Sequence, residues 1–245
     1  MDYLLEVIAF NIGSVLLAQN SGAHRIELCD NPGEGGTTPS YGMIKTAREK
    51  TTLLLYPIIR PRGGDFLYNE EEFEVMKRDI SLCRELQCDG VVIGLLQKDG
   101  SIDKARTARL AEAAYPLGVT FHRAFDRAAN PFEALEEIIE TGCERILTSG
   151  LKPTAPEGAD TIEALVRQAD DRIIIMPGSG VRADNIASLA QQTQAAQFHS
   201  SARKSIASAM EYINVQMNEE LLSTQLDTDE VAKMLKALSS LDTGK

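Results

Sequence analysis

Two histidines and two glutamates lie in or directly after short apolar runs of this 245-residue chain, a pattern that could carry proton transfer. His122 stands near the end of GVTFHR, and His199 near the end of AAQFHS. An imidazole titrates close to neutral pH, so either ring could act as a general acid or base while Glu6 or Glu27 holds its tautomer. Glu27 and His122 are therefore the candidate catalytic residues. The alternative for each histidine is a hydrogen-bonded side chain without a catalytic role.

Three arginines also follow apolar runs. TLLLYPI leads into IRPRGGDF, which contains Arg60 and Arg62, and Arg123 comes directly after His122. A guanidinium offers a flat fork of donors to carboxylate or phosphate oxygens, so this set predicts a small anionic ligand. The alternative is a structural network in which the arginines pair with buried carboxylates and bind no ligand.

Small residues follow three further apolar runs, in the segments RILTSG, PGSGVR and FHSSAR. Loops of this kind present backbone N–H groups to phosphate, most effectively where one of them opens a helix. Together with Glu6, the candidate anion-binding residues in these segments are Ser149, Gly178, Ser179, Gly180, His199, Ser200 and Ser201.

The elements that must position these side chains alternate along the whole chain. The apolar runs predict strands over Leu4–Phe10, His24–Cys29, Thr52–Arg60, Gly90–Leu96, Gly118–Arg123, Arg145–Gly150, Arg172–Pro177 and Ala195–Ser200. Helical spacing of apolar residues predicts helices over Ile12–Asn20, Tyr41–Lys50, Glu70–Leu86, Asp103–Ala114, Pro131–Thr141, Ala159–Gln168 and Asp184–Gln192. Asn130 and Asp103 are suitable residues for starting two of these helices.

The predicted fold class is α/β, a closed (β/α)8 TIM barrel, because continuously apolar strands indicate a parallel sheet covered on both faces. A doubly wound open sheet is the alternative. Active sites of such barrels lie at the carboxyl ends of the strands, where the polar residues above occur. We expect a single domain over residues 1–245, with an irregular segment near 204–228 before a C-terminal helix over Asp229–Leu241.

Composition excludes several classes of partner. The formal net charge of −11 argues against nucleic acids and anionic membranes, which require a basic surface. The start of the chain does not resemble a signal peptide, and no apolar run approaches the ~20 residues of a membrane helix. The four cysteines lack disulfide or C-x-x-C spacing, which favours a reducing compartment, so we expect a cytoplasmic protein.

Metal and Schiff-base chemistry find little support in the spacing. Cys29 is the one cysteine expected near the strand ends, and as a Cu(I) ligand it would need a further sulfur or imidazole nearby. Cys83, Cys88 and Cys143 are expected on the opposite side. No lysine lies within a predicted strand, which disfavours a Schiff-base aldolase.

Taken together, the motifs resemble the copper homeostasis protein CutC family, a family of (β/α)8 barrels. The resemblance rests on RIELCDNPGEGGTTPS, IIRPRGGDFLY, VTFHRAFD, RILTSG, PGSGVR and FHSSAR, and it covers nearly the whole chain. It implies a cytoplasmic homodimer or higher homo-oligomer, associated with copper tolerance and with Cu(I) binding through cysteines. Many relatives carry cysteine where this chain has Ile8, and some where it has Ser200, so we expect weak copper binding or a site shared between subunits.

Three functions therefore compete. The resemblance favours copper handling through Cys29. The residues themselves favour an enzyme of unassigned activity on a small anionic substrate, whose phosphate group, if it has one, would bind the Gly178–Gly180 loop and Ser200 and Ser201. A non-catalytic barrel whose mouth is a binding platform is the third, because a fold alone does not determine function.

Overall fold

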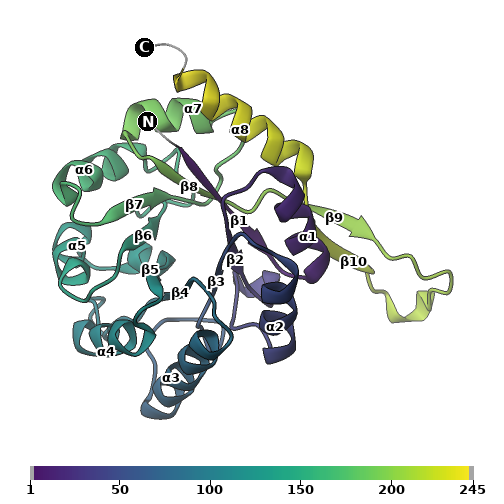
Figure 1. The fold of residues 1–245 in the computed structure, drawn as a ribbon, viewed down its shortest axis with the longest axis horizontal. Helices are drawn as coiled ribbons and strands as arrows, with labels where there is room; N and C mark the ends of the chain where they lie inside the picture. The colour runs from purple at the N-terminus through teal and green to yellow at the C-terminus, as the bar shows by residue number, and fades with distance from the viewer. Residues whose placement is uncertain (1–2, 243–245) are drawn as a thin grey trace.

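The computed structural model describes residues 3–242, which contain a ring of parallel strands surrounded by helices (Figure 1). The strands of the ring are β1 (Leu4–Ala9), β2 (Arg25–Leu28), β3 (Leu54–Pro57), β4 (Gly90–Ile93), β5 (Gly118–Phe121), β6 (Arg145–Thr148), β7 (Ile174–Pro177) and β8 (Gln197–Ser200). The helices are α1 (Ile12–Ser21), α2 (Tyr41–Lys50), α3 (Glu70–Glu85), α4 (Lys104–Ala114), α5 (Pro131–Ile139), α6 (Ala159–Ala169), α7 (Ile186–Thr193) and α8 (Thr228–Asp242).

The strands close into a barrel. Parallel pairing gives the orders β3-β2-β1-β8 and β4-β5-β6-β7. The two halves meet where the Ile59 N–H donates to the carbonyl of Val92 at 2.8 Å, and where β7 lies beside β8. The (β/α)8 prediction is confirmed, and the open doubly wound sheet is excluded.

Local sequence signals start the helices as expected. The Asn130 side chain accepts hydrogen bonds from the backbone N–H groups of Phe132 and Glu133, with Pro131 at the first helical position of α5. Asp103 accepts from the N–H of Arg106 at the start of α4. Both satisfy N–H groups that have no partner within the helix, so the predicted starts at these residues are confirmed.

Strands β1 to β6 each end earlier than predicted, and after β3 and β5 the difference shapes the mouth. The run expected to extend to Arg60 ends as β3 at Pro57, and the run expected to reach Arg123 ends as β5 at Phe121. Residues Arg123–Arg127 form a short 3-10 helix instead, whose cap is His122. The imidazole Nδ1 accepts from the N–H of Ala124 at 3.1 Å, and this hydrogen bond turns the chain away from the sheet.

The segment near 204–228, expected to be irregular, contains two strands and is irregular only between them. Strands β9 (Arg203–Ala207) and β10 (Leu222–Leu226) pair antiparallel and form a hairpin that projects from the barrel (Figure 1). Helical periodicity is absent there because side chains on this ribbon alternate between its two faces. Helix α8 then packs against α7 and α1, as expected for the last covering helix.

The interior of the barrel near the amino ends of the strands is polar. The guanidinium groups of Arg25 and Arg145 both donate to Gln197 Oε1, at 3.0 and 2.9 Å. Arg25 also pairs with the carboxylate of Glu6, and both arginines lie over the ring of Tyr56. This network occupies the interior of the barrel beneath the carboxyl ends of the strands.

Candidate functional site

A cavity of about 350 Å³ opens at the carboxyl ends of the strands. Of the residues that the sequence singled out, its lining contains Glu27, Arg60, His122, Arg123, Ser179, Gly180, His199 and Ser201. These residues come from five of the strands or from the segments that follow them. The barrel therefore brings together side chains spread over most of the chain.

The other candidates lie outside the cavity lining. Ser149 is buried and its hydroxyl hydrogen-bonds to Asp126 and to the carbonyl of Lys152. Ser200 donates to the carbonyl of Val181 at 2.7 Å. The Gly178 N–H donates to the carbonyl of Thr148. Because these groups hydrogen-bond to other parts of the protein, Ser149, Ser200 and Gly178 support the walls of the cavity.

Arg62 is placed differently from Arg60. Its guanidinium is bound to the carboxylates of Glu72 and Asp65, at 2.5 and 2.9 Å, and to nearby carbonyls. The side chain is 37% exposed and lies over the ring of Tyr68. It therefore ties the loop after β3 to the start of α3.

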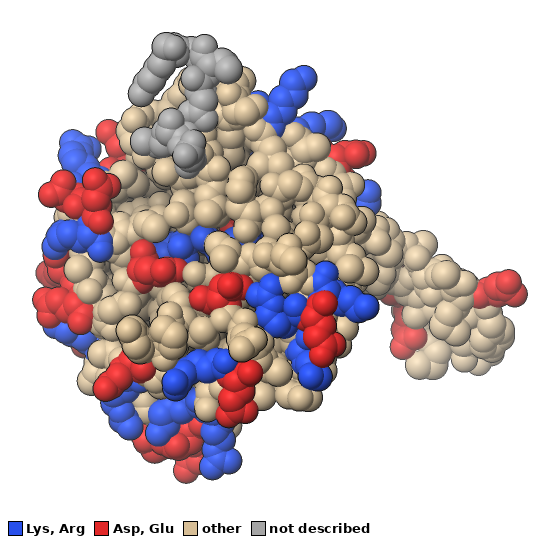
Figure 2. All heavy atoms as spheres, in the orientation of Figure 1, with Lys and Arg blue, Asp and Glu red and all other residues tan. Residues whose placement is uncertain are grey.

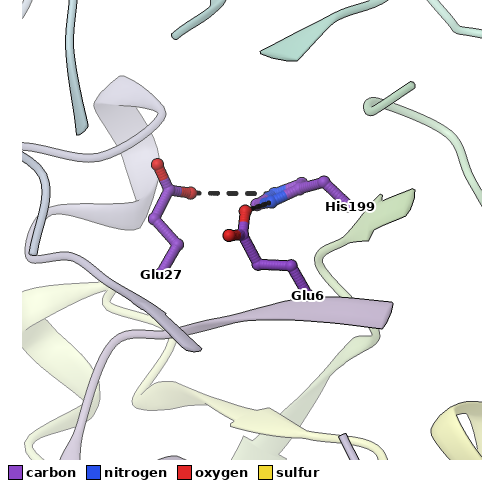
Figure 3. A group of neighbouring side chains, drawn as sticks. All are labelled: Glu6, Glu27 and His199. Atoms are coloured by element: carbon purple, nitrogen blue, oxygen red, sulfur yellow. Dashed lines mark hydrogen bonds and ion pairs between the residues drawn. The ribbon is translucent and has the colours of Figure 1, made fainter. Parts of the chain in front are cut away.

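Glu6, Glu27 and His199 form a buried cluster at the floor of the cavity (Figure 3). They come from neighbouring strands β1, β2 and β8, which the ring places side by side. His199 Nδ1 lies 2.7 Å from Glu6 Oε1, and its Nε2 lies 3.7 Å from Glu27 Oε2. Glu6 thus fixes the imidazole, whose other nitrogen faces Glu27.

The carboxyl groups of Glu6 and Glu27 have different pKa values because their environments differ. Burial raises the pKa of Glu27 to about 7, against the opposing charge of His199. Burial acts on Glu6 in the same direction, but the charge of Arg25 and the hydrogen bond to His199 outweigh it and lower its pKa to about 2. Burial also disfavours the imidazolium, yet Glu6 and Glu27 raise the pKa of His199. Glu27 can therefore gain or lose a proton near neutral pH while Glu6 stays ionised.

His122 is a neutral hydrogen-bond donor. Burial and the charge of Arg60 lower the pKa of its imidazole to about 3. Because Nδ1 accepts the Ala124 N–H, the proton of the neutral ring lies on Nε2. That buried Nε2 has no hydrogen-bond partner anywhere in residues 3–242, although His122 lines the cavity. A bound ligand would supply the missing acceptor.

Arg60 carries a buried charge without a carboxylate partner. Its guanidinium donates to the carbonyls of Glu34, Gly36 and Gly64, at 2.7, 2.8 and 2.9 Å. No ion pair joins it to an acidic side chain in the part of the chain that the structure describes. The carbonyls hold the guanidinium in place but leave its charge uncompensated, which favours an anion in the cavity.

Arg127, which was not among the predicted site residues, adds a further positive charge to the cavity lining. It donates to the carbonyl of Arg123 and lies 5.3 Å from the centre of the Phe66 ring, while Arg60 lies 5.0 Å from that same ring. Burial and the charge of Arg123 lower the pKa of Arg127. Repulsion among these guanidinium groups would be relieved by a bound anion.

Arg123 differs from its neighbour because it has an acidic partner. Its Nε donates to Asp126 at 2.7 Å, and Asp126 also accepts from the hydroxyls of Thr148 and Ser149. Asp126 was not predicted as a site residue, although the motif VTFHRAFD contains it. It joins the 3-10 helix after β5 to the end of β6 and so fixes one wall of the cavity.

The surroundings of Cys29 do not fit Cu(I). Burial, with the charges of Glu27 and Glu6, raises the pKa of the Cys29 thiol well above its usual range. Cu(I) prefers thiolates, thioethers and imidazoles to carboxylates. The other three cysteines lie in or before elements at the opposite ends of the strands. A second thiolate for Cys29 is therefore missing from this chain's described residues.

A simple period-two pattern could have found more of the site. Alternate residues of a strand share a face, so Arg25 and Glu27 point the same way, as do Arg145 and Leu147. On sequence alone, these strands were interpreted as continuously apolar. The residues it missed on the cavity lining are Ile8, Phe10, Pro32, Glu34, Gly35, Ile58, Phe66, Arg127, Leu147 and Arg203.

Comparisons with known proteins agree with this architecture. The family model described as "CutC family" matches residues 3–204. The family protein CutC of Chromobacterium violaceum is 54% identical over 212 residues, covering 86% of each chain, and that of Parabacteroides distasonis is 52% identical over 231 residues, covering 93% of this chain and 95% of the relative.

Solved structures extend the likeness to three dimensions. The copper homeostasis protein CutC from Streptococcus agalactiae has a TM-score of 0.77 and 37% identity, covering 81% of this chain and 98% of that one. Thiamine phosphate pyrophosphorylase from Pyrococcus furiosus, at 16% identity and a TM-score of 0.60 over 98% of this chain and 96% of that one, shares the fold alone. The family match and the identities to these relatives show that the chain belongs to the CutC family.

Proposed function

We propose that the mouth of this barrel binds a small anionic metabolite and transfers a proton on it. The observation that carries the proposal is a pair of cavity residues that lack partners within residues 3–242: Arg60 is a buried cation without a carboxylate partner, and the buried Nε2 of His122 has no acceptor. Both line the same cavity as Glu27, the carboxyl with a pKa of about 7. An anion between the two donors would lie within the reach of a group that can exchange protons.

A phosphate group suits the rest of the lining. Ser179 and Gly180 follow β7, and neither backbone N–H donates a hydrogen bond within residues 3–242. Loops after β7 and β8 bind phosphate in many barrels. In the proposed arrangement these N–H groups and Arg127 hold the phosphate, His122 donates to a neutral or anionic oxygen, and Glu27 exchanges the proton.

The test is ligand binding followed by turnover. Inorganic phosphate and a library of phosphorylated metabolites are screened by thermal shift, and hits are measured by calorimetry. Arg127→Ala is expected to weaken binding at least about tenfold, whereas Arg167→Ala, on the 75% exposed side chain of α6, leaves it unchanged. No stabilisation by any compound, or equal loss in both variants, contradicts the proposal. A hit that binds but is not converted favours a binding platform.

Copper handling is the second candidate, because a family relative of solved structure is named for copper homeostasis. The geometry around Cys29 argues against a tight Cu(I) site within one chain. Anaerobic Cu(I) titration against a competing chelator, on the native protein and Cys29→Ser, decides between them. Tight binding that Cys29→Ser removes would support copper handling.

We propose that the protein acts in the cytoplasm, as a single domain and as a homo-oligomer, as its family resemblance implies. No helix among the described residues is long and apolar enough to span a bilayer.

A further inference from the structure

The hairpin formed by β9 and β10, residues 203–226, carries positive charge only at its base. Arg203 and Lys204 are its only basic residues, in a chain with a formal net charge of −11. Figure 2 shows the outer part of the hairpin as mostly uncharged surface, with acidic side chains near its end. The positive charge is therefore concentrated where the hairpin meets the barrel.

The pairing of the two strands places three polar side chains of the base on one face. Arg203 and Ser205 are alternate residues of β9, and Thr224 of β10 is the partner of Ser205 in the antiparallel register. Leu226, the partner of Arg203, is only 2% exposed, so this face of the hairpin turns toward the barrel. The guanidinium and the two hydroxyls therefore face the barrel together.

A hollow of about 370 Å³ lies against this face and adjoins the mouth cavity. Its lining shares two residues, Pro32 and Arg203, with the lining of that cavity. Among the described residues, no acidic side chain joins the lining, which consists of Pro32, Gly33, Arg203, Lys204, Ser205 and Thr224. The guanidinium of Arg203 and the hydroxyls of Ser205 and Thr224 have no hydrogen-bond partner within residues 3–242. The hollow therefore offers free donors and a positive charge to an anion beside the mouth.

The other free cations of the mouth lie apart from Arg203. The guanidinium groups of Arg60 and Arg127 are 5.0 and 5.3 Å from the centre of the Phe66 ring, whereas that of Arg203 is 5.9 Å from the centre of the Phe10 ring. Arg127 follows β5 and Arg203 follows β8, three strands further along the ring. An anionic group bound beside Phe66 therefore leaves the charge of Arg203 uncompensated.

The carboxyl proposed to exchange a proton lies between these two regions. Glu27 is on β2, and in the ring β2 lies between β3, which precedes Arg60, and β8, which precedes Arg203. All three side chains line the mouth cavity. A ligand that extends from one cationic region to the other would therefore pass Glu27.

We infer, on the basis of the proposed function, that the ligand of the mouth is a small metabolite with an anionic group at each end. One group occupies the anion site assigned above, beside Arg127. The other occupies the hollow, where Arg203 supplies the charge and Ser205 and Thr224 supply hydroxyl donors. The carbon chain between the two groups lies across Glu27, which exchanges a proton with it.

The experiment compares straight-chain monophosphates whose other end is a hydroxyl, a carboxylate or a second phosphate, over a series of chain lengths, by calorimetry on the full chain. A second anionic end should tighten binding at least about tenfold at one optimal length, because a shorter chain cannot span both sites and a longer one gains less. The carboxylate and phosphate compounds show which anion the hollow prefers.

Variants locate the second site. Arg203→Ala should remove the gain, so that compounds with two anionic ends bind no tighter than the monophosphate, and Arg203→Lys should keep most of it because the charge remains. Arg127→Ala should weaken both classes of compound. Arg167→Ala, on the 75% exposed side chain of α6, is the control and should change neither. Arg203 is exposed, so circular dichroism should show unchanged folding.

The outcomes separate this inference from the proposed function. Monophosphates that bind through Arg127, with no gain from a second anionic end, would overturn the inference and leave the proposed function standing. A gain that is equal at every chain length, or that survives Arg203→Ala, would also overturn the inference. Failure of every compound to bind would contradict the proposed function, and the inference with it.

Discussion

Nδ1 of His199 lies 2.7 Å from Oε1 of Glu6, although 192 residues separate them in the chain. The same carboxylate pairs with Arg25, so it is held ionised and its charge supports the imidazolium. Glu27, on the far side of the ring, has no such cation of its own and takes up protons near neutral pH. One carboxylate fixes geometry and the other is available for proton transfer.

Replacing Glu27 with glutamine should stabilise the protein above pH 7. The folded-state pKa of about 7 exceeds the ordinary value of 4.5. Between pH 4.5 and pH 7 the folded state therefore holds a proton on Glu27 that the unfolded state has released. Stability therefore falls as pH rises through this window, and the full cost of ionisation is present above pH 7. Glu27→Gln removes that cost. In urea denaturation it should raise the free energy of unfolding by on the order of 2 kcal/mol at pH 8 and by much less at pH 5. An equal effect at both pH values would contradict the raised pKa.

Replacing Glu6 with glutamine should be strongly destabilising. The substitution leaves Arg25 buried without its carboxylate, which costs roughly 3–5 kcal/mol. Because the pKa of Glu6 is lowered to about 2, its contribution is present above pH 4.5 and is lost as pH falls toward 2. Urea denaturation at pH 7 measures the change, with Glu163→Gln in an exposed pair on α6 as control. A loss no larger than that of the control would show that Glu6 is dispensable.

The two histidines of the cavity should titrate differently. The pKa of His122 is lowered to about 3 and that of His199 is raised above 6.5. NMR of the imidazole resonances between pH 5 and 8 should show a constant signal for His122 and a shifting one for His199. The spectrum of His122→Gln assigns the signals. A His122 resonance that moves near pH 6.5 would mean that the ring is not held neutral by burial and Arg60.

Replacing Arg60 with lysine should loosen the mouth. An ammonium keeps the charge but cannot reach the carbonyls of Glu34, Gly36 and Gly64 with a planar fork. We expect a loss of about 1–3 kcal/mol in stability and faster amide hydrogen exchange in residues 34–36 and 63–64. Arg62→Lys serves for comparison because that side chain is 37% exposed. Unchanged exchange in these segments would remove the structural role assigned to Arg60.

Cys29 should be unreactive in the folded protein. Its thiol is fully buried and its pKa is raised by burial and by Glu27. An aromatic disulfide reagent at pH 8 should modify it only after unfolding, because the thiolate is the attacking species. Reaction of the native protein at the rate of a free thiol, abolished by Cys29→Ser, would contradict the buried environment.

Much of the fold was predictable because its signals are local. Apolar runs marked every strand of the ring, and Asn130 and Asp103 marked two helix starts. The hairpin of β9 and β10 was not predictable in the same way, since its strands are largely exposed and the loop between them has no periodicity. Strand ends were also misjudged where the His122 hydrogen bond to Ala124 replaces sheet pairing.

The sequence by itself determined the strand–helix alternation and the chemical types gathered at the strand ends, because propensity, periodicity and capping act over a few residues. Tertiary structure alone decided which of these side chains meet. Arg60 and Arg62 are two residues apart. Arg60 is buried among backbone carbonyls and lines the cavity, whereas Arg62 is bound to Glu72 and lies outside the cavity lining. Strand register and loop closure control such differences, because they set burial and partners, and these in turn separate the acidities of Glu6 and Glu27.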